Sequence, residues 1–197
     1  MRTVTILIIS FLIFAIACNE KPENYPPPLV DGNISDFIDL GIDPVNLGDS
    51  VDLYIYQNQH YVWLGYTYPE GSYGLLDLEI VTPKLEDTLR IHVSAQLGEW
   101  PSNNPDLVPQ SPESELWWNM NGWIANEVWL NGTDRSGETP RYKFRNASAR
   151  EMQMSKGRFG RGEWKMQLNI TNIKGKNGED YNILFPEDRS FYTLNAY

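Results

Sequence analysis

Cysteine and histidine are scarce in this 197-residue chain, which has one cysteine, Cys18, and two histidines, His60 and His92. A single cysteine excludes both an internal disulfide and a zinc site built from several thiolates. Two histidines are too few for a three-histidine zinc site, and they do not form a His-x-x-x-His pair. The chain also lacks a Gly-x-Ser-x-Gly motif and a phosphate-binding glycine loop. We therefore expect no enzymatic activity and no redox or organic cofactor.

Basic residues are also fewer than acidic ones. The chain carries 16 Lys and Arg against 26 Asp and Glu, a formal net charge of −10 at pH 7. A chain of this sign is repelled by phosphate backbones, so nucleic acid is not an expected partner.

Helical periodicity is missing from the sequence, and alternation of apolar and polar residues takes its place. The clearest example is residues 88–95, where Leu89, Ile91 and Val93 alternate with Arg90 and His92. Similar runs occur at 51–56, 61–68, 76–80, 123–130 and 163–170, separated by turns rich in Gly and Asn. This pattern predicts an all-β fold, a single-domain antiparallel β-sandwich of immunoglobulin-like or jelly-roll-like type. The same alternation places Trp164 in the core, and Trp63 is expected to be buried because its strand is apolar on both faces.

The longest apolar run, Val4 to Ala17, is shorter than the ~20 residues that span a bilayer, and it follows the basic residue Arg2. These are the features of a signal peptide. The run ends in Ala15-Ile16-Ala17-Cys18, which resembles the lipobox of bacterial lipoproteins, in which the cysteine becomes the acylated N-terminus. We therefore expect a signal peptide at 1–17, a lipidated Cys18 with a proline-rich spacer at 18–28, and a domain at 29–197. The resemblance implies an exported lipoprotein, lipid-anchored to the outer membrane or cell surface.

Several segments of the expected domain are similar to family 9 carbohydrate-binding-module-like domains. The opening, residues 29–37, has an Asp-Gly turn followed by an acidic residue and an aromatic one. The hairpin at 51–66 and the strands at 149–154 and 162–168 match the order of the family's later elements. The 149–154 strand has Met152-Gln153 where the family usually has an Ile-Pro step. The resemblance implies a β-sandwich and, less directly, carbohydrate binding, because one fold serves many functions.

The candidate ligand site follows from alternation in the strand at 123–130. Trp123, Glu127 and Trp129 share one face, opposite the apolar Ile124, Val128 and Leu130. Two tryptophans beside an acid would form a platform for sugar rings, and Arg90 or His92 from a neighbouring strand would bind the hydroxyls. Trp100 lies in a segment with four prolines, 97–116, which we expect to be a loop and an insertion relative to the family. If this loop instead folds over the tryptophans, they form a second small core.

Other polar clusters have simpler explanations. Four residues near the domain start carry oxygen ligands that suit calcium, but the same residue types form turns: Asp31, Asn33, Asp36 and Asp39. Four carboxylates could in principle pair for glycoside hydrolysis, although acids on strand faces are usually solvated: Asp77, Glu79, Glu127 and Glu151. The function we expect is non-catalytic carbohydrate binding at a membrane. The alternative is an interaction or assembly subunit of a cell-surface complex that holds a protein partner.

The anchor can be tested at Cys18. Replacing the thiol that would carry the lipid, in Cys18→Ser, should abolish acylation and release the protein from the membrane fraction. Mass spectrometry of the purified protein and cell fractionation measure both effects. An unchanged mass together with normal membrane fractionation of the variant would refute lipidation at this residue.

Overall fold

The computed structural model describes residues 26–197, except residues 49, 95–96, 112, 118–123, 135–136 and 139–140, and only the backbone of 124–134 and 141–146. The predicted signal peptide, Cys18 and most of the spacer lie outside the described residues. The described elements, in chain order, are α1 (Ser35–Asp39), β1 (Val45–Asn46), β2 (Asp52–Gln57), β3 (Tyr61–Thr67), β4 (Leu75–Val81), β5 (Leu89–Val93), β6 (Leu97–Pro101), the 3-10 helix η1 (Pro105–Leu107), β7 (Ile124–Asp134), β8 (Arg141–Ser155), α2 (Lys156–Phe159), β9 (Gly162–Lys174), β10 (Asp180–Phe185) and β11 (Tyr192–Ala196). No helix in this part of the chain is long and apolar enough to cross a membrane.

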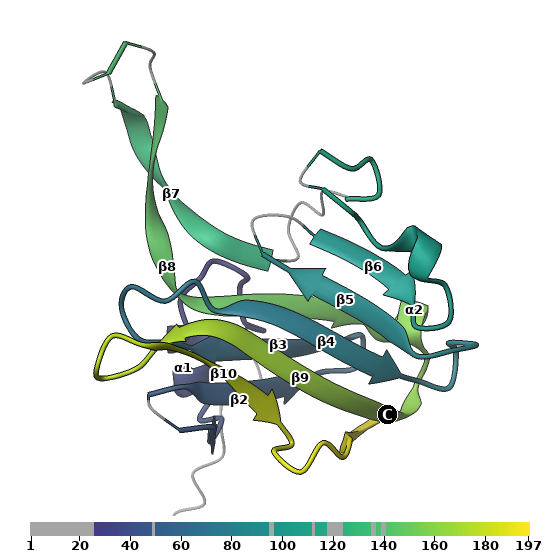
Figure 1. Cartoon of the computed structure of the whole chain (residues 1–197). Helices are drawn as coiled ribbons and strands as arrows, with labels where there is room; N and C mark the ends of the chain where they lie inside the picture. The colour runs from purple at the N-terminus through teal and green to yellow at the C-terminus, as the bar shows by residue number, and fades with distance from the viewer. Residues whose placement is uncertain are drawn as a thin grey trace, which may run out of the picture.

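The strands form two antiparallel sheets that pack face to face (Figure 1). Sheet A has the order β1-β2-β3-β8-β7, and sheet B has the order β10-β9-β4-β5-β6, with β11 also paired to β9. Neighbouring strands in both sheets are antiparallel, including the β2–β3 and β4–β5 hairpins. The prediction of an all-β antiparallel sandwich in a single domain is confirmed.

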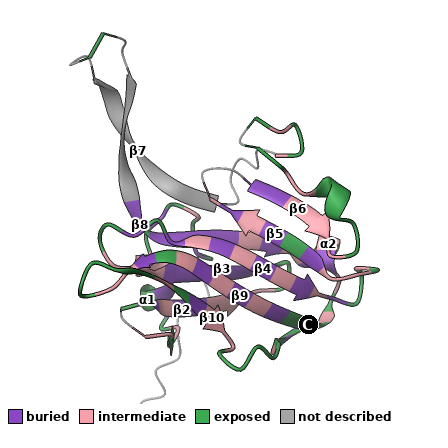
Figure 2. Ribbon diagram, viewed as in Figure 1, coloured by how far each residue is buried: buried purple, intermediate pink, exposed green. Residues whose placement is uncertain are grey.

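Alternation along the strands of sheet B determines which side chains face the core (Figure 2). In β4, Leu76, Leu78 and Ile80 are buried, and the residues between them are partly exposed. The strands β5 and β9 follow the same period, as predicted from the sequence. The polar residues of these strands therefore share the outer face of sheet B.

The core between the sheets contains Trp164, which has no exposed surface and packs against Phe159 with ring centroids 5.5 Å apart. Trp63 is also buried, as predicted, but in a separate cluster with Phe37 and Tyr54. This second cluster lies on the outer side of sheet A, beneath α1. Gly65 permits the close approach, because a Cβ there would lie 2.7 Å from the Cδ1 atom of Ile34.

The proline-rich segment 97–116 differs from the expected loop, because its first five residues form β6 at the edge of sheet B. Leu97 is buried against the core, which provides the apolar contact that a strand needs. Pro101 ends the strand, and an edge position tolerates the missing N–H donor of proline. The expectation of an irregular loop was therefore wrong for residues 97–101 and for the 3-10 helix η1.

Strands β7 and β8 form a long hairpin that projects beyond the sandwich (Figure 1). The pairing has irregularities between Ala125 and Glu127 and between Leu130 and Thr133. Only part of β8 continues into the body of sheet A, where it pairs with β3.

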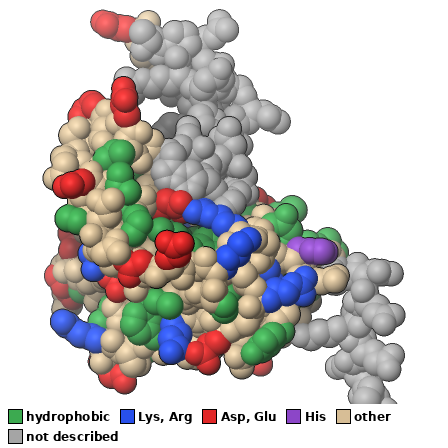
Figure 3. All heavy atoms as spheres, turned by 90° about the vertical axis from the view of Figure 1, so that its right-hand side faces the viewer, with side chains coloured by type: hydrophobic (Ala, Val, Ile, Leu, Met, Phe, Trp, Pro, Cys, Tyr) green, Lys and Arg blue, Asp and Glu red, His purple; other side chains and the backbone are tan. Residues whose placement is uncertain are grey.

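Charged side chains of both signs are interspersed on the side of the molecule drawn in Figure 3. Among the described residues on this side, basic groups form no continuous surface. The picture agrees with the acidic net charge of the chain.

The core assignment can be tested at Trp164, whose Nε1 atom donates a hydrogen bond to the carbonyl oxygen of Gly160 at 2.8 Å. Removing this fully buried indole in Trp164→Ala should lower the free energy of unfolding by ~3–5 kcal/mol. Lys165→Ala removes the neighbouring, half-exposed side chain and should change it by less than ~0.5 kcal/mol. Chemical denaturation measures both values. A loss below ~1 kcal/mol for Trp164→Ala would contradict the assigned strand face.

Candidate functional site on the outer face of sheet B

Two rows of outward side chains cross sheet B. In the first row, Asp77 of β4 pairs with Asn169 of β9 on one side and with His92 of β5 on the other. In the second row, Glu79 pairs with Gln167 and Arg90 in the same way. Paired residues of antiparallel strands point to one side of a sheet, and neighbouring strands lie ~4.8 Å apart. We call these six side chains, together with Trp100, the polar face.

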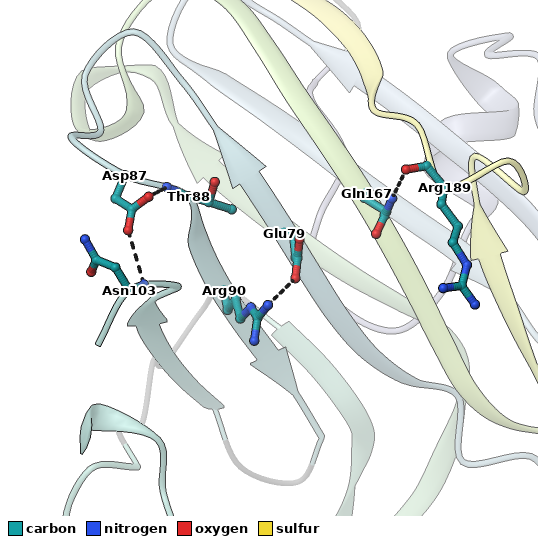
Figure 4. A network of polar contacts seen from close by, with 7 residues as sticks. All are labelled: Glu79, Asp87, Thr88, Arg90, Asn103, Gln167 and Arg189. Carbon is teal, nitrogen blue, oxygen red and sulfur yellow. Dashed lines mark hydrogen bonds and ion pairs between the residues drawn. The ribbon is translucent and has the colours of Figure 1, made fainter. Parts of the chain in front are cut away.

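Two contacts link β4 to β5 across the polar face. The Nη2 atom of Arg90 lies 2.9 Å from the Oε1 atom of Glu79 (Figure 4), and the Nδ1 atom of His92 lies 2.7 Å from the Oδ1 atom of Asp77. All four side chains keep between a fifth and a half of their surface exposed. The polar groups are therefore ordered by each other and remain accessible to a ligand.

Two tryptophans border the polar face at β6. Trp100 is paired with Arg90, and Gly98 is paired with His92. The indole of Trp117 lies directly over Gly98, where a Cβ atom would come within 2.9 Å of its ring. The ring centroids of Trp117 and His92 are 5.5 Å apart, and the Nε1 atom of Trp117 donates a hydrogen bond to the carbonyl oxygen of Ser111. The absence of a side chain at Gly98 thus brings an aromatic ring onto the sheet.

On the side of β9, the polar face opens into a groove of about 450 Å³. Its lining comes from β4, β9, β10 and the connection that follows β10: Asp77, Glu79, Gln167, Asn169, Asn182, Leu184 and Arg189. The Nε2 atom of Gln167 donates hydrogen bonds to the main-chain oxygens of Arg189 at 2.7 Å and Ser190 at 3.1 Å, and Figure 4 shows the first of them. These bonds hold the connection against the edge of the polar face.

A second hollow, of about 480 Å³, lies between the edge strands β1 and β10. Its lining mixes apolar residues, such as Leu47, Ile183 and Phe185, with the polar residues Asn46 and Glu187. It has no ion pair among its lining residues in the described part of the chain. The polar face is the better candidate for a ligand with many hydroxyl groups.

The structure brings together three of the six predicted ligand-binding residues, Arg90, His92 and Trp100, on this face. Trp123 lies outside the described residues. Glu127 and Trp129 lie in β7, opposite Asn146 and Phe144 of β8, and only their backbone is described.

We expected Arg90 or His92 to lie on a strand next to that of Glu127, and the order of the strands contradicts this expectation. The strand that carries Arg90 and His92 pairs with β4 and β6 in sheet B, whereas β7 pairs with β8 at the edge of sheet A. A strand next to that of Glu127 therefore does not supply Arg90 or His92. The proposed roles of Trp123, Glu127 and Trp129 in sugar binding stay predictions.

Sequence reasoning missed several residues of the site. Alternation in β9 places Gln167 and Asn169 on the outer face, so these two could have been included. No local signal connects Trp117 to Gly98 or Arg189 to Gln167, because each pair meets only through the tertiary fold.

In the predicted calcium cluster, the side chains of Asp31, Asn33 and Asp36 accept hydrogen bonds from nearby backbone N–H groups. The Oδ1 atom of Asp31 accepts from the N–H of Asn33, and the Oδ2 atom of Asp36 accepts from the N–H of Leu29. Across the described residues, no group of three or more His, Cys, Asp or Glu side chains is arranged to hold a metal ion. These hydrogen bonds match the alternative explanation, in which Asp and Asn form turns.

Glu151 does not share a site with the carboxylates of the polar face, because it lies on β8 in sheet A. It is buried under the turn at residues 31–33. Its Oε2 atom accepts hydrogen bonds from three backbone N–H groups, at 3.0 Å from Asp31, 2.6 Å from Gly32 and 3.1 Å from Asn33. Burial raises the pKa of this carboxyl to about 7, although the three donors act in the opposite direction. Glu151 therefore joins the start of the domain to sheet A.

Comparisons of the chain with known protein families, curated protein sequences and solved structures find no match.

Glu151 should give the stability of the protein a pH dependence. Its pKa is higher in the folded state than the ordinary value of 4.5, so between pH 4.5 and 7 the folded state binds more protons than the unfolded state. The contribution of Glu151 to the free energy of unfolding is therefore greatest below pH 4.5 and is lost as pH rises to about 7. Glu151→Gln should lack this slope.

Denaturation of both proteins at pH 5 and pH 8 measures the effect. Glu163→Gln, at an exposed position of β9, is the matched control for the loss of one carboxylate. Equal differences between wild type and Glu151→Gln at the two pH values would contradict a raised pKa.

Proposed function

We propose that this protein is a non-catalytic carbohydrate-binding lipoprotein, and that the polar face of sheet B contacts the glycan. The observation that carries the proposal is the position of Trp100 and Trp117 beside two rows of hydrogen-bonding side chains on one open sheet face. An indole ring packs against the C–H face of a sugar ring, while carboxylates, amides and guanidinium groups bind hydroxyls.

The spacing of the polar face suits a chain-like ligand. Both rows have one outward side chain on each of β9, β4 and β5, at intervals of ~4.8 Å; on β6 the second row ends in Trp100 and the first at Gly98. A glycan that crosses the strands would meet a new set of donors and acceptors at each strand. The tryptophans at β6 and the groove at β9 would bind its two ends.

A catalytic role has less support. Glycoside hydrolysis needs a carboxylic acid that carries a proton beside a second, ionised carboxylate. Each carboxylate of the polar face instead contacts a basic side chain, Glu79 at 2.9 Å from Arg90 and Asp77 at 2.7 Å from His92. This arrangement positions carboxylate oxygens for polar contacts and does not place two carboxylates in contact with each other.

The resemblance of residues 29–195 to family 9 carbohydrate-binding-module-like domains supports the same proposal. In our proposal the lipidated Cys18 anchors the protein to the outer membrane or cell surface after export. Glu127 and Trp129 of β7, together with Trp123, which precedes this strand in the sequence, would add a second contact region.

The proposal is tested by substitution of the two tryptophans. Trp100→Ala and Trp117→Ala should each weaken glycan binding about tenfold, a loss of ~1.4 kcal/mol, because each removes one stacking surface. A glycan array identifies a ligand, and titration calorimetry measures the affinity. Tyr73→Ala removes an exposed aromatic side chain away from the polar face and serves as the control.

The same titration on Trp123→Ala and Trp129→Ala decides whether β7 contributes. Unchanged affinity in both the Trp100 and Trp117 variants would remove the polar face as the site. A glycan array without signal would contradict carbohydrate binding and favour the interaction subunit.

A further inference from the structure

We infer that the groove beside β9 takes an acidic glycan, one with a carboxylate or sulfate on the sugar unit, and that Arg189 binds this anionic group. The inference rests on the proposed carbohydrate-binding function and specifies its ligand class. It follows from the charges that line the groove.

Both carboxylates of the groove already have a partner on β5. Glu79 is paired with Arg90 at 2.9 Å, and Asp77 is hydrogen-bonded to His92 at 2.7 Å. One oxygen of each carboxylate is already used in these contacts, and the guanidinium of Arg90 offsets the charge of Glu79. The protein itself therefore supplies a partner for each of the two acids.

Arg189 is the exception among the charged lining residues. Its guanidinium forms no ion pair or hydrogen bond with any described residue. The only dashed line drawn to Arg189 in Figure 4 ends on its main-chain oxygen. Its backbone is nevertheless fixed: the carbonyl oxygen accepts the bond from Gln167, and the N–H donates to the carbonyl oxygen of Pro186. Arg189 is thus the one charged side chain of the groove lining that has no partner among the described residues.

The acids next to Arg189 in the sequence do not cancel this charge within the groove. Glu187 and Asp188 line a separate hollow with Pro186 and Ser190. The Oδ1 atom of Asp188 accepts a hydrogen bond from the N–H of Ser190, which keeps its side chain within the turn.

A guanidinium presents two parallel N–H donors that match the oxygens of a carboxylate or sulfate. The amides of Asn169 and Asn182, in the same lining, can bind the hydroxyls next to that group. The uncharged hydroxyls of a neutral glycan would accept only single hydrogen bonds from the Arg189 guanidinium, and a basic sugar would be repelled by it.

The experiment compares glycans that share a backbone and differ in charge. Polygalacturonate is paired with its methyl-esterified form, and dextran sulfate is paired with dextran, so that carboxylate and sulfate are tested separately. Affinity is measured by titration calorimetry at low salt and again at ~0.5 M salt, where screening weakens exposed charge contacts. We expect at least one acidic member to bind about tenfold more tightly than its neutral counterpart at low salt.

Arg189→Gln should abolish this preference, and Arg189→Lys should retain part of it, because lysine keeps the charge and loses the paired donors. Arg161→Gln makes the same change in net charge at a position outside the groove, where the Nη2 atom bonds to the main chain of Gln59. This control should behave like the wild type. Thermal melts establish that all three variants are folded.

The experiment distinguishes a failure of the acidic-glycan inference from a failure of the proposed carbohydrate binding. Equal binding of acidic and neutral members, with no effect of Arg189→Gln, would overturn the inference and leave carbohydrate binding intact. A preference for acidic glycans that Arg189→Gln does not reduce would also overturn it. No binding of any glycan in these pairs or on the array would overturn both.

Discussion

Sheet B depends on the burial of one side of its central strands, β9, β4 and β5. The inward side chains of these strands are leucine, isoleucine, valine, methionine and one tryptophan, and each fully buried aliphatic side chain contributes ~1.5–3 kcal/mol. Because side chains alternate, the same burial forces the intervening polar residues onto the opposite side. The candidate site is therefore a consequence of core formation. The core fixes the register of the sheet, and the register places Asp77 beside His92 and Glu79 beside Arg90.

Sheet A has a different arrangement, because its outer side is covered. The turn at residues 31–33 bonds to the buried Glu151, and α1 packs Phe37 against Tyr54 and over Gly65. This segment is far from β8 in sequence, so its attachment depends on a small number of tertiary contacts. The two outer faces of the sandwich therefore differ. The outer face of sheet A carries a small second core beneath α1, and the outer face of sheet B is an open polar surface.

The sequence predicted what depends on local pattern and missed what depends on long-range pairing. Alternation identified the strands, the burial of Trp164 and the outward direction of Arg90 and His92, and the apolar strand around Trp63 identified its burial. It could not give the strand order, and so it placed the strand of Glu127 beside that of Arg90, although the two strands belong to different sheets. It also treated 97–101 as loop, because proline and glycine there outweighed the one buried leucine. The groove depends on Gln167 holding a connection 22 residues further along the chain, a contact without a local signal.

The position of the N-terminal segment has a consequence for how the domain would be displayed. Residues 29–42 lie on the outer side of sheet A, so the chain enters the domain on the side opposite the polar face. A proline-rich spacer of the length expected for 18–28 reaches ~30 Å when extended at ~3.1 Å per residue. An anchor on Cys18 would then turn sheet A toward the bilayer and sheet B toward the surroundings. If the proposed lipid anchor and glycan binding hold, this geometry would present the polar face to long polymers that do not reach the membrane surface.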